Sequence, residues 1–207
     1  MASATVIPAG GTFVDTLKKS FVDVPVDKEK DNAIDTAAFL DAAESLTTIF
    51  DLLGSVAFTP VKNDMLGNVK KIRDRLLAAP AESETIQELV LNELKTKKHV
   101  ATEGLLWLIR GLEFVCIALS QNLAQATTEL ADSFRTAYSE TLKPHHSFIV
   151  KPVFSAAMSA VPYRKDFYAK VGSDEEKVKA DLGEYLASLD KIVGILKGFL
   201  DRKEAKW

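Results

Sequence analysis

Apolar residues recur along this chain at intervals of three and four, the spacing that places side chains on one face of an α-helix. Two such stripes are Phe39, Ala43, Leu46, Phe50 and Leu53, and Leu182, Leu186, Leu189, Val193, Leu196 and Leu200. Between residues 102 and 123 the sequence is apolar on most sides, with a narrow polar strip of Glu103, Arg110 and Glu113. A helix of this kind is buried at the centre of a fold, so other helices must pack around it.

The breaks between these patterns predict the fold class. Seven of them are marked by Pro25, Gly54, Pro60, Pro80, Pro144, Pro152 and Pro162. No window alternates apolar and polar residues with the composition of a strand, so we expect an all-α fold of about eight helices and no sheet. Nothing like a linker divides the 207 residues, which predicts one domain over residues 1–207. Residues 1–11 lack the pattern of a secretion signal and are expected to form a loose arm.

Charge and cysteine content exclude several classes of function. The chain has 26 Lys and Arg against 29 Asp and Glu, a formal charge of −3 that predicts no binding to nucleic acid. Its single cysteine, Cys116, cannot form an intramolecular disulfide, which suits the cytoplasm. The longest apolar run, Phe114–Leu119, is far shorter than the roughly 20 residues that span a bilayer. Any contact with a membrane is therefore expected to be peripheral.

The usual signatures of catalysis are missing from the sequence. It contains no Gly-rich phosphate loop, nucleophile elbow or HExxH motif, so we expect neither an enzyme nor a cofactor. His145 and His146, taken as neighbours on a helix, would point about 100° apart, and His99 is remote in sequence. These positions predict no metal site.

A polar face follows Pro60, where a helix is expected to begin. Asp64, Asn68 and Lys71 stand at positions i, i+4 and i+7, which span only about 60° of a helix circumference. A carboxylate accepts from hydroxyls, an amide both donates and accepts, and an ammonium donates to hydroxyl oxygens. The three residues therefore suit a sugar, although the same pattern is also typical of a solvated face with an ion pair.

Two further residues suit an amphiphilic ligand. Trp107 lies beside the polar strip, one turn before Gly111, where a missing side chain would leave space for a flat ligand. Indole faces stack on the C–H faces of pyranose rings. His146 lies on or beside an apolar face, where a neutral imidazole can donate to an amide carbonyl. Packing in the core is the commoner role for each residue, so these two side chains alone do not define a site.

Three linked motifs resemble the glycolipid transfer protein family. They are Phe58-Thr-Pro-Val-Lys-Asn-Asp-Met-Leu-Gly-Asn-Val-Lys-Lys-Ile, Leu106-Trp-Leu-Ile-Arg-Gly-Leu, and His145-His-Ser-Phe-Ile-Val with Val161-Pro-Tyr-Arg-Lys-Asp-Phe. The resemblance runs from about residue 39 to 167 and is especially close to the fungal heterokaryon-incompatibility members. It implies a two-layer sandwich of helices that binds a headgroup at its surface and hydrocarbon chains in an apolar pocket between the layers.

The resemblance also implies roles for matching residues. Asp64, Asn68 and Lys71 match the family's sugar contacts, and Trp107 matches its stacking platform. His146 matches the group that bonds the ceramide amide, whose N–H Asp64 would accept. Reading both amide groups would exclude glycerolipids, whose esters lack the N–H. The implied ligand is a glycosphingolipid of the glucosylceramide, galactosylceramide or lactosylceramide type, rather than a ceramide phosphate.

Apolar positions complete the implied site. Those that match the hydrocarbon pocket are Phe58, Val61, Phe114, Val153 and Phe154, which would also suit an ordinary core. Phe148 and Tyr163 are the expected membrane contacts. The chain departs from the family pattern in three places: Phe148 replaces the Trp of animal members, Pro152 is expected to interrupt its helix, and Ala118 replaces a larger pocket residue. Membrane docking and chain preference therefore depend on features particular to this sequence.

Together these features predict a monomeric carrier that docks transiently on a membrane, extracts one glycosphingolipid and releases it at another bilayer. One alternative is a glycolipid sensor that acts through a protein partner. Another is a lipid hydrolase with Asp64 and His146 as its acid–base groups, although sugar cleavage usually needs two carboxylates.

Overall fold

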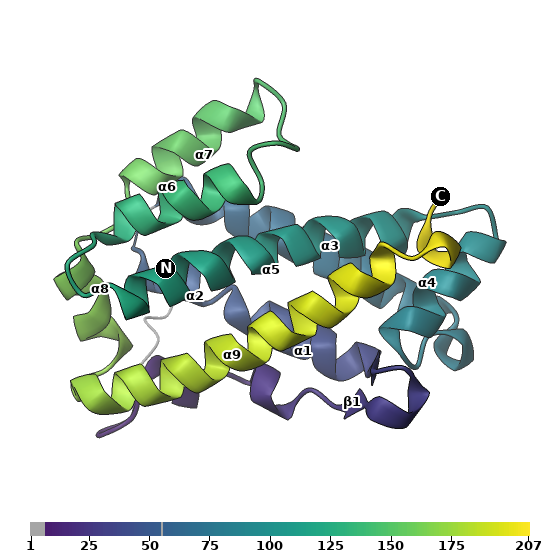
Figure 1. Ribbon diagram of the computed structural model, residues 1–207, viewed down its shortest axis with the longest axis horizontal. Coiled ribbons are helices and arrows are strands. Elements are labelled where there is room, and N and C mark those ends of the chain that lie inside the picture. The colour runs from purple at the N-terminus through teal and green to yellow at the C-terminus, as the bar shows by residue number, and fades with distance from the viewer. Residues whose placement is uncertain (1–6, 55) are drawn as a thin grey trace.

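The computed structural model describes residues 7–54 and 56–207 and is built almost entirely of helices (Figure 1). The α-helices in this part of the chain are α1 Thr36–Leu46, α2 Ile49–Leu52, α3 Thr59–Ala78, α4 Ile86–Lys95, α5 Val100–Ala124, α6 Leu130–Glu140, α7 Val150–Ser159, α8 Arg164–Val171 and α9 Glu175–Leu200. Six 3₁₀ turns are η1 Phe13–Thr16, η2 Phe21–Asp23, η3 Lys28–Lys30, η4 Val56–Phe58, η5 Pro80–Glu82 and η6 Lys203–Ala205. The all-α prediction is confirmed, and none of the described helices is both long and apolar enough to cross a membrane.

One small sheet departs from that prediction. Strands β1 Val26–Asp27 and β2 Ala33–Ile34 pair in antiparallel register, so the expectation of no sheet is wrong. Asp31 and Asn32, with φ angles of 54° and 56°, turn the chain back between the strands. Asp and Asn adopt this left-handed conformation more readily than most residues. Two-residue strands are too short to show the alternation by which a strand is recognised in a sequence.

The long helix α5 forms the centre of the molecule. It contacts α3, α4, α6 and α9, and the side chains of Leu105, Leu108 and Leu112 are fully buried. In Figure 1, α6 and α7 lie above α5, and α1 and α9 lie below it. This is the buried helix that the apolar segment at residues 102–123 predicts.

Two glycines allow α3 to lie close against α5. A Cβ atom added at Gly104 would meet the Cβ of Lys71 at 3.2 Å, and one at Gly111 would meet the Cγ of Met65 at 3.4 Å. The space expected beside Gly111 for a ligand is therefore occupied by Met65, and that expectation is wrong. Both glycines instead serve the contact between helices, since a larger side chain at either position would force α3 away.

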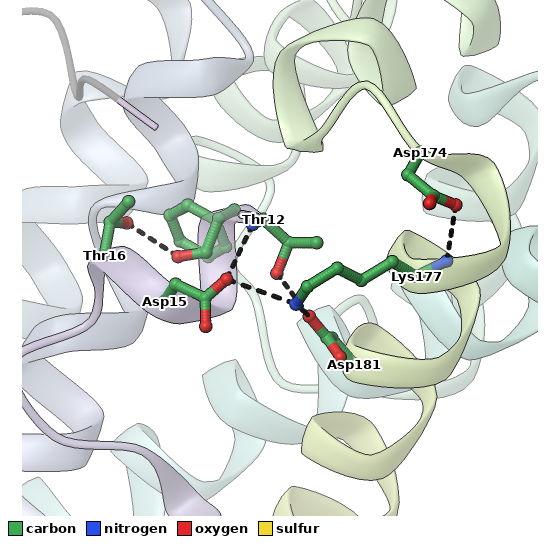
Figure 2. Close-up of polar contacts among 7 residues, drawn as sticks. Thr12, Asp15, Thr16, Asp174, Lys177 and Asp181 are labelled. Atoms are coloured by element: carbon green, nitrogen blue, oxygen red, sulfur yellow. Dashed lines mark hydrogen bonds and ion pairs between the residues drawn. The ribbon is translucent and has the colours of Figure 1, made fainter. Parts of the chain in front are cut away.

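Polar contacts fasten the N-terminal segment to α9 (Figure 2). The hydroxyl of Thr12 donates to Asp181 at 2.8 Å, and its backbone N–H donates to Asp15 at 2.8 Å. Lys177 contacts both carboxylates, with an N–O distance of 3.3 Å to Asp15. These contacts hold η1 in place, so that Phe13 enters the core at 1% exposure.

The arm expected over residues 1–11 lies partly outside the described residues, which begin at residue 7. Within the described part, the N–H of Gly11 donates to the carbonyl of Pro8 at 2.9 Å, and Thr12 forms an isolated β-bridge with Gly172. Residues 8–11 thus form a hydrogen-bonded turn that leads into this bridge. The loose arm over residues 1–11 stays a prediction.

The start of α5 is stabilised by a buried acid of α4. The preceding residue, His99, makes no side-chain cap. Instead, the carboxylate of Glu93 accepts from the backbone N–H groups of Ala101 and Thr102 at 2.9 and 2.7 Å, and from the Thr102 hydroxyl at 2.7 Å. Glu93 is only 4% exposed. Its negative charge lies at the positive end of the helix dipole, which ties α4 to the central helix.

We expect Glu93→Ala to lower the free energy of unfolding by about 2–4 kcal/mol, because it leaves two buried N–H groups and a hydroxyl without an acceptor. Urea unfolding followed by circular dichroism measures the change. Glu103→Ala is the matched control, since Glu103 is an exposed acid in the first turn of the same helix and should cost less than about 1 kcal/mol. Equal losses in the two variants would contradict the capping role.

Candidate functional site

Three side chains of α3 form a hydrogen-bonded row. The amide nitrogen of Asn68 donates to Asp64 Oδ2 at 3.3 Å, and the ammonium of Lys71 donates to Asn68 Oδ1 at 3.1 Å. Asn68 is buried at 3% exposure, whereas Asp64 and Lys71 are exposed. We call these three residues the polar row. Its centre is fixed by packing and its two charged ends remain open to solvent.

The charge of Asp64 is opposed by its surroundings. Loss of hydration to neighbouring protein atoms raises the pKa of this carboxyl, and the positive charge of Lys71 offsets part of the effect. Donors from a ligand would favour the ionised carboxylate, because hydrogen bonds to the charged form stabilise it. Asp64 is thus an exposed acceptor whose ionised form a bound N–H or O–H group would stabilise.

Trp107 lies one turn from both Gly104 and Gly111, two points at which α5 packs closely against α3. The indole is therefore carried on the side of α5 that faces α3. Its ring stacks on that of His146, with ring centroids 5.8 Å apart and planes at 19°. The structure brings together two residues that are 39 positions apart in the sequence.

Two neighbours of the indole were not predicted. The guanidinium of Arg110 lies over the Trp107 ring, 4.9 Å from its centroid, and His145 meets the ring edge-on at 6.5 Å. Arg110 stands three positions after Trp107 on the polar strip of α5, so helical spacing was a signal that could have found it. Nothing in the sequence marked His145 as a contact of the indole.

The sequence predicted that His145 and His146 lie on a helix, and this prediction is wrong. They belong to the turn between α6 and α7, after Pro144. Helix α7 begins only at Val150, so Pro152 lies in its first turn, where backbone N–H groups have no partner within the helix. The expected interruption of the helix at Pro152 is therefore wrong. Among the described residues, no group of three or more His, Cys, Asp or Glu side chains is placed to hold a metal ion.

The surroundings of His146 favour the neutral form of its imidazole. Burial lowers its pKa, and the positive charges of His145, Lys151 and Arg110 lower it further. Its Nδ1 atom lies 3.2 Å from the hydroxyl of Tyr138. A neutral imidazole has one donor and one acceptor nitrogen, so this contact leaves Nε2 for a ligand.

A continuous series of rings leads from His146 into the core. We call it the aromatic column, and in order of contact it consists of His146, Phe154, Tyr138, Phe114, Phe134, Phe58 and Phe50. Successive centroids are 4.5 to 6.4 Å apart, and every ring after His146 is buried. The column joins six segments of the chain, because its rings come from α2, η4, α5, α6, α7 and the turn before α7.

Four of the five expected pocket residues are buried in or beside this column. Phe58, Phe114 and Phe154 belong to it, and Val61 is buried at 4% exposure. Val153 does not join them, because it is 40% exposed on the outer side of α7. Ala118 is fully buried on α5.

Two hollows in the described part of the molecule lie away from the column. One of about 430 Å³ is lined by Thr16–Lys19 and residues of α1, and one of about 570 Å³ lies between α5 and α9. Neither is lined by the polar row, Trp107 or His146. Because rings occupy the interior next to His146, hydrocarbon could enter there only if the rings of the column moved apart.

Large exposed apolar residues lie at the end of the histidine turn and just before α8. Phe148 is 82% exposed, Ile149 is 68% exposed, and Tyr163, just before α8, is 68% exposed. Lys151 and Lys165 are exposed near them in the sequence. Ile149 was not among the expected contacts, although its position next to Phe148 was a signal that could have found it.

Comparison with known proteins points to one family. The family model described as "Glycolipid transfer protein (GLTP)" matches residues 34–173. A glycolipid transfer protein of Aureobasidium melanogenum is 64% identical over 200 residues, which cover 97% of this chain and 98% of that protein. Pleckstrin homology domain-containing family A member 8 of Danio rerio is 35% identical over 198 residues, and the matched part is only 36% of its length.

Two solved structures have the same fold. HET-C2, described as a fungal glycolipid transfer protein, is 73% identical with a TM-score of 0.93, covering 95% of this chain and 100% of that one. The GLTP-fold structure of FAPP2 is 32% identical with a TM-score of 0.82, covering 92% of this chain and 95% of that one. These similarities confirm the helical fold that the sequence motifs implied. The chain belongs to the glycolipid transfer protein family.

Proposed function

We propose that this protein binds one glycosphingolipid and carries it between membranes without catalysing a reaction. The main support is the Trp107–His146 stack at the outer end of the aromatic column, with the polar row on the helix that packs against the helix of Trp107. An amphiphile has the same order of parts, a polar headgroup, then an amide, then hydrocarbon. The relatives support the ligand class, since HET-C2 is described as a glycolipid transfer protein and FAPP2 as selecting simple glycosphingolipids.

The polar row is the proposed contact for the sugar. Lys71 and Asn68 supply donors to hydroxyl oxygens, and Asp64 accepts from hydroxyl groups. Trp107 offers its ring to the C–H face of the first sugar. A sugar stacked on the ring face now covered by Arg110 would displace the guanidinium, which could then donate to sugar hydroxyls. These contacts suit a glucosyl, galactosyl or lactosyl headgroup.

The amide contact gives the proposed selectivity for sphingolipids. Asp64 accepts the amide N–H, and His146 donates to the amide carbonyl. A glycerolipid has ester linkages and no such N–H, so it would leave Asp64 without this donor. The raised pKa of Asp64 fits this role, because the amide N–H replaces hydration that the protein has removed.

The aromatic column is the proposed route for hydrocarbon. Chains would enter among Phe58, Phe114 and Phe154 as these rings separate. Each CH₂ kept out of water is worth about 0.8 kcal/mol, so unaided escape of a lipid through water is slow. Moving the chains from bilayer to protein interior avoids that cost, and transfer needs no chemical step.

Several further properties belong to the same proposal. We expect a single domain, because one core contains side chains from η1 at one end of the described chain to η6 at the other. We also expect this domain to act as a monomer in the cytoplasm. The exposed group of Phe148, Ile149 and Tyr163 is the proposed transient membrane contact. Among the polar row, Trp107 and His146, only Asp64 carries a carboxylate, whereas sugar hydrolysis usually needs two.

We expect Trp107→Ala to slow movement of fluorescent glucosylceramide and galactosylceramide between vesicles at least about tenfold, because loss of the stacking platform weakens capture of the sugar. Phosphatidylcholine and ceramide phosphate are the lipid controls, and circular dichroism checks the fold. Ile117→Ala is the matched variant, since Ile117 is a half-buried residue of the same helix outside the proposed site.

The outcomes of this assay separate the alternatives. Full transfer by a folded Trp107→Ala protein would contradict the stacking role. Tight binding by the unaltered protein without transfer would favour a glycolipid sensor. Absence of binding would contradict the assignment of the site, and conversion of the lipid during the assay would favour a hydrolase.

We expect Phe148→Asp to weaken binding to vesicles and to slow transfer, because a charge at this position opposes insertion of the exposed apolar group into the bilayer surface. Binding of a short-chain glucosylceramide in solution should be unchanged. Leu77→Asp is the control, since Leu77 is 73% exposed at the far end of α3. Vesicle flotation and the transfer assay measure the two effects, and equal losses in both variants would rule out a specific contact at Phe148.

A further inference from the structure

The hydroxyl of Tyr138 lies 3.2 Å from Nδ1 of His146. The direction of this hydrogen bond determines which of the two imidazole nitrogens carries the ring proton. If the hydroxyl donates, Nδ1 is the acceptor and the ring proton resides on Nε2. If Nδ1 donates, Nε2 carries no proton and cannot donate to a carbonyl. The two arrangements differ in what His146 can bind.

Hydrogen-bond accounting favours donation by Tyr138. Its side chain is buried at 4% exposure, and among the described residues His146 is the only hydrogen-bond partner of its hydroxyl. If Nδ1 carried the proton, the hydroxyl hydrogen of this buried residue would have no protein acceptor among the described residues, which is unfavourable. Burial also raises the pKa of Tyr138, so the hydroxyl keeps its proton. The hydroxyl therefore donates to Nδ1.

The tyrosine is held firmly enough to impose this choice. Its ring stacks on Phe154, with centroids 5.1 Å apart and planes at 10°, and meets Phe114 edge-on at 6.3 Å. The imidazole is also packed between two helices. Its ring centroid lies 4.5 Å from that of Phe154 on α7 and 5.8 Å from that of Trp107 on α5. Both members of the hydrogen bond are thus oriented by packing on rings of α5 and α7.

We infer that Tyr138 is a positioning residue that fixes His146 as the Nε2–H tautomer and so supplies the donor for a ligand carbonyl. The assignment of the tautomer depends only on contacts within the lipid-free protein. Its use in binding a ceramide amide rests on the proposed function. Together with Asp64, an acceptor, the fixed Nε2–H would complete a donor and acceptor pair for one amide.

The first test uses lipid-free protein labelled with ¹⁵N on histidine. Long-range ¹H–¹⁵N spectra should show the proton of His146 on Nε2 and none on Nδ1. Tyr138→Phe keeps the ring and removes only the hydroxyl, so the Nδ1 resonance should move. Because the hydroxyl stabilises the neutral ring, its loss should also raise the measured pKa of His146 by about 0.5 to 1. The charges of His145, Lys151 and Arg110 next to the ring are unchanged in this variant.

Tyr185→Phe is the matched control. Tyr185 is fully buried on α9, and its hydroxyl has no hydrogen-bond partner in the described part of the molecule. This variant should leave the Nδ1 resonance and the pKa of His146 unchanged. A proton on Nδ1 in the unaltered protein would overturn the inference. So would identical His146 spectra and pKa values in Tyr138→Phe and the unaltered protein.

The second test measures use of the tautomer. Tyr138→Phe should slow glucosylceramide transfer by about two- to tenfold, the range expected for one weakened hydrogen bond, whereas Tyr185→Phe should not. Unchanged transfer with a changed tautomer signal would overturn the positioning role. Absence of transfer by the unaltered protein would instead contradict the proposed function, and the spectra of the free protein would still decide the tautomer.

Discussion

The close contact between α3 and α5 is the constraint on which the rest of the candidate site depends. It exists because Gly104 and Gly111 have no side chains where Lys71 and Met65 approach. A Cβ at Gly104 would already lie unusually close to Lys71, and a Cβ at Gly111 would just touch Met65. A larger side chain at either position would separate the helices. Without this contact α3, which carries the polar row, would lie farther from the side of α5 that carries Trp107, and the proposed site would lose one of its two halves.

The second half of the site is joined to the core rather than to the surface. His146 belongs to a turn, yet its position is fixed by Trp107 on one helix and by Tyr138 and Phe154 on two others. The same rings continue inward as the aromatic column. Under the proposed function, binding of a headgroup would be linked to opening of the interior, because movement of Phe154 changes the surroundings of His146.

The spacing of residues in the sequence predicted which side chains share a face within one helix. It did not predict contacts that depend on how separate segments pack together. The polar row follows from positions i, i+4 and i+7 on α3, and the buried centre follows from the apolar segment of α5. The stack of Trp107 on His146 does not follow, because the path of the turn before α7 depends on packing against other helices. Gly111 was misinterpreted for the same reason, since the sequence does not show that Met65 lies over it. Val153 faces outward because α7 turns Phe154, Ala157 and Met158 toward the core.

The most direct test of the account is a crystal structure of the protein with bound glucosylceramide. The account predicts the sugar against Asp64, Asn68 and Lys71, the amide between Asp64 and His146, and at least one hydrocarbon chain among Phe58, Phe114 and Phe154, whose rings have moved apart. A lipid with its chains in the hollow between α5 and α9, or one bound while the aromatic column stays closed, would contradict the central claim.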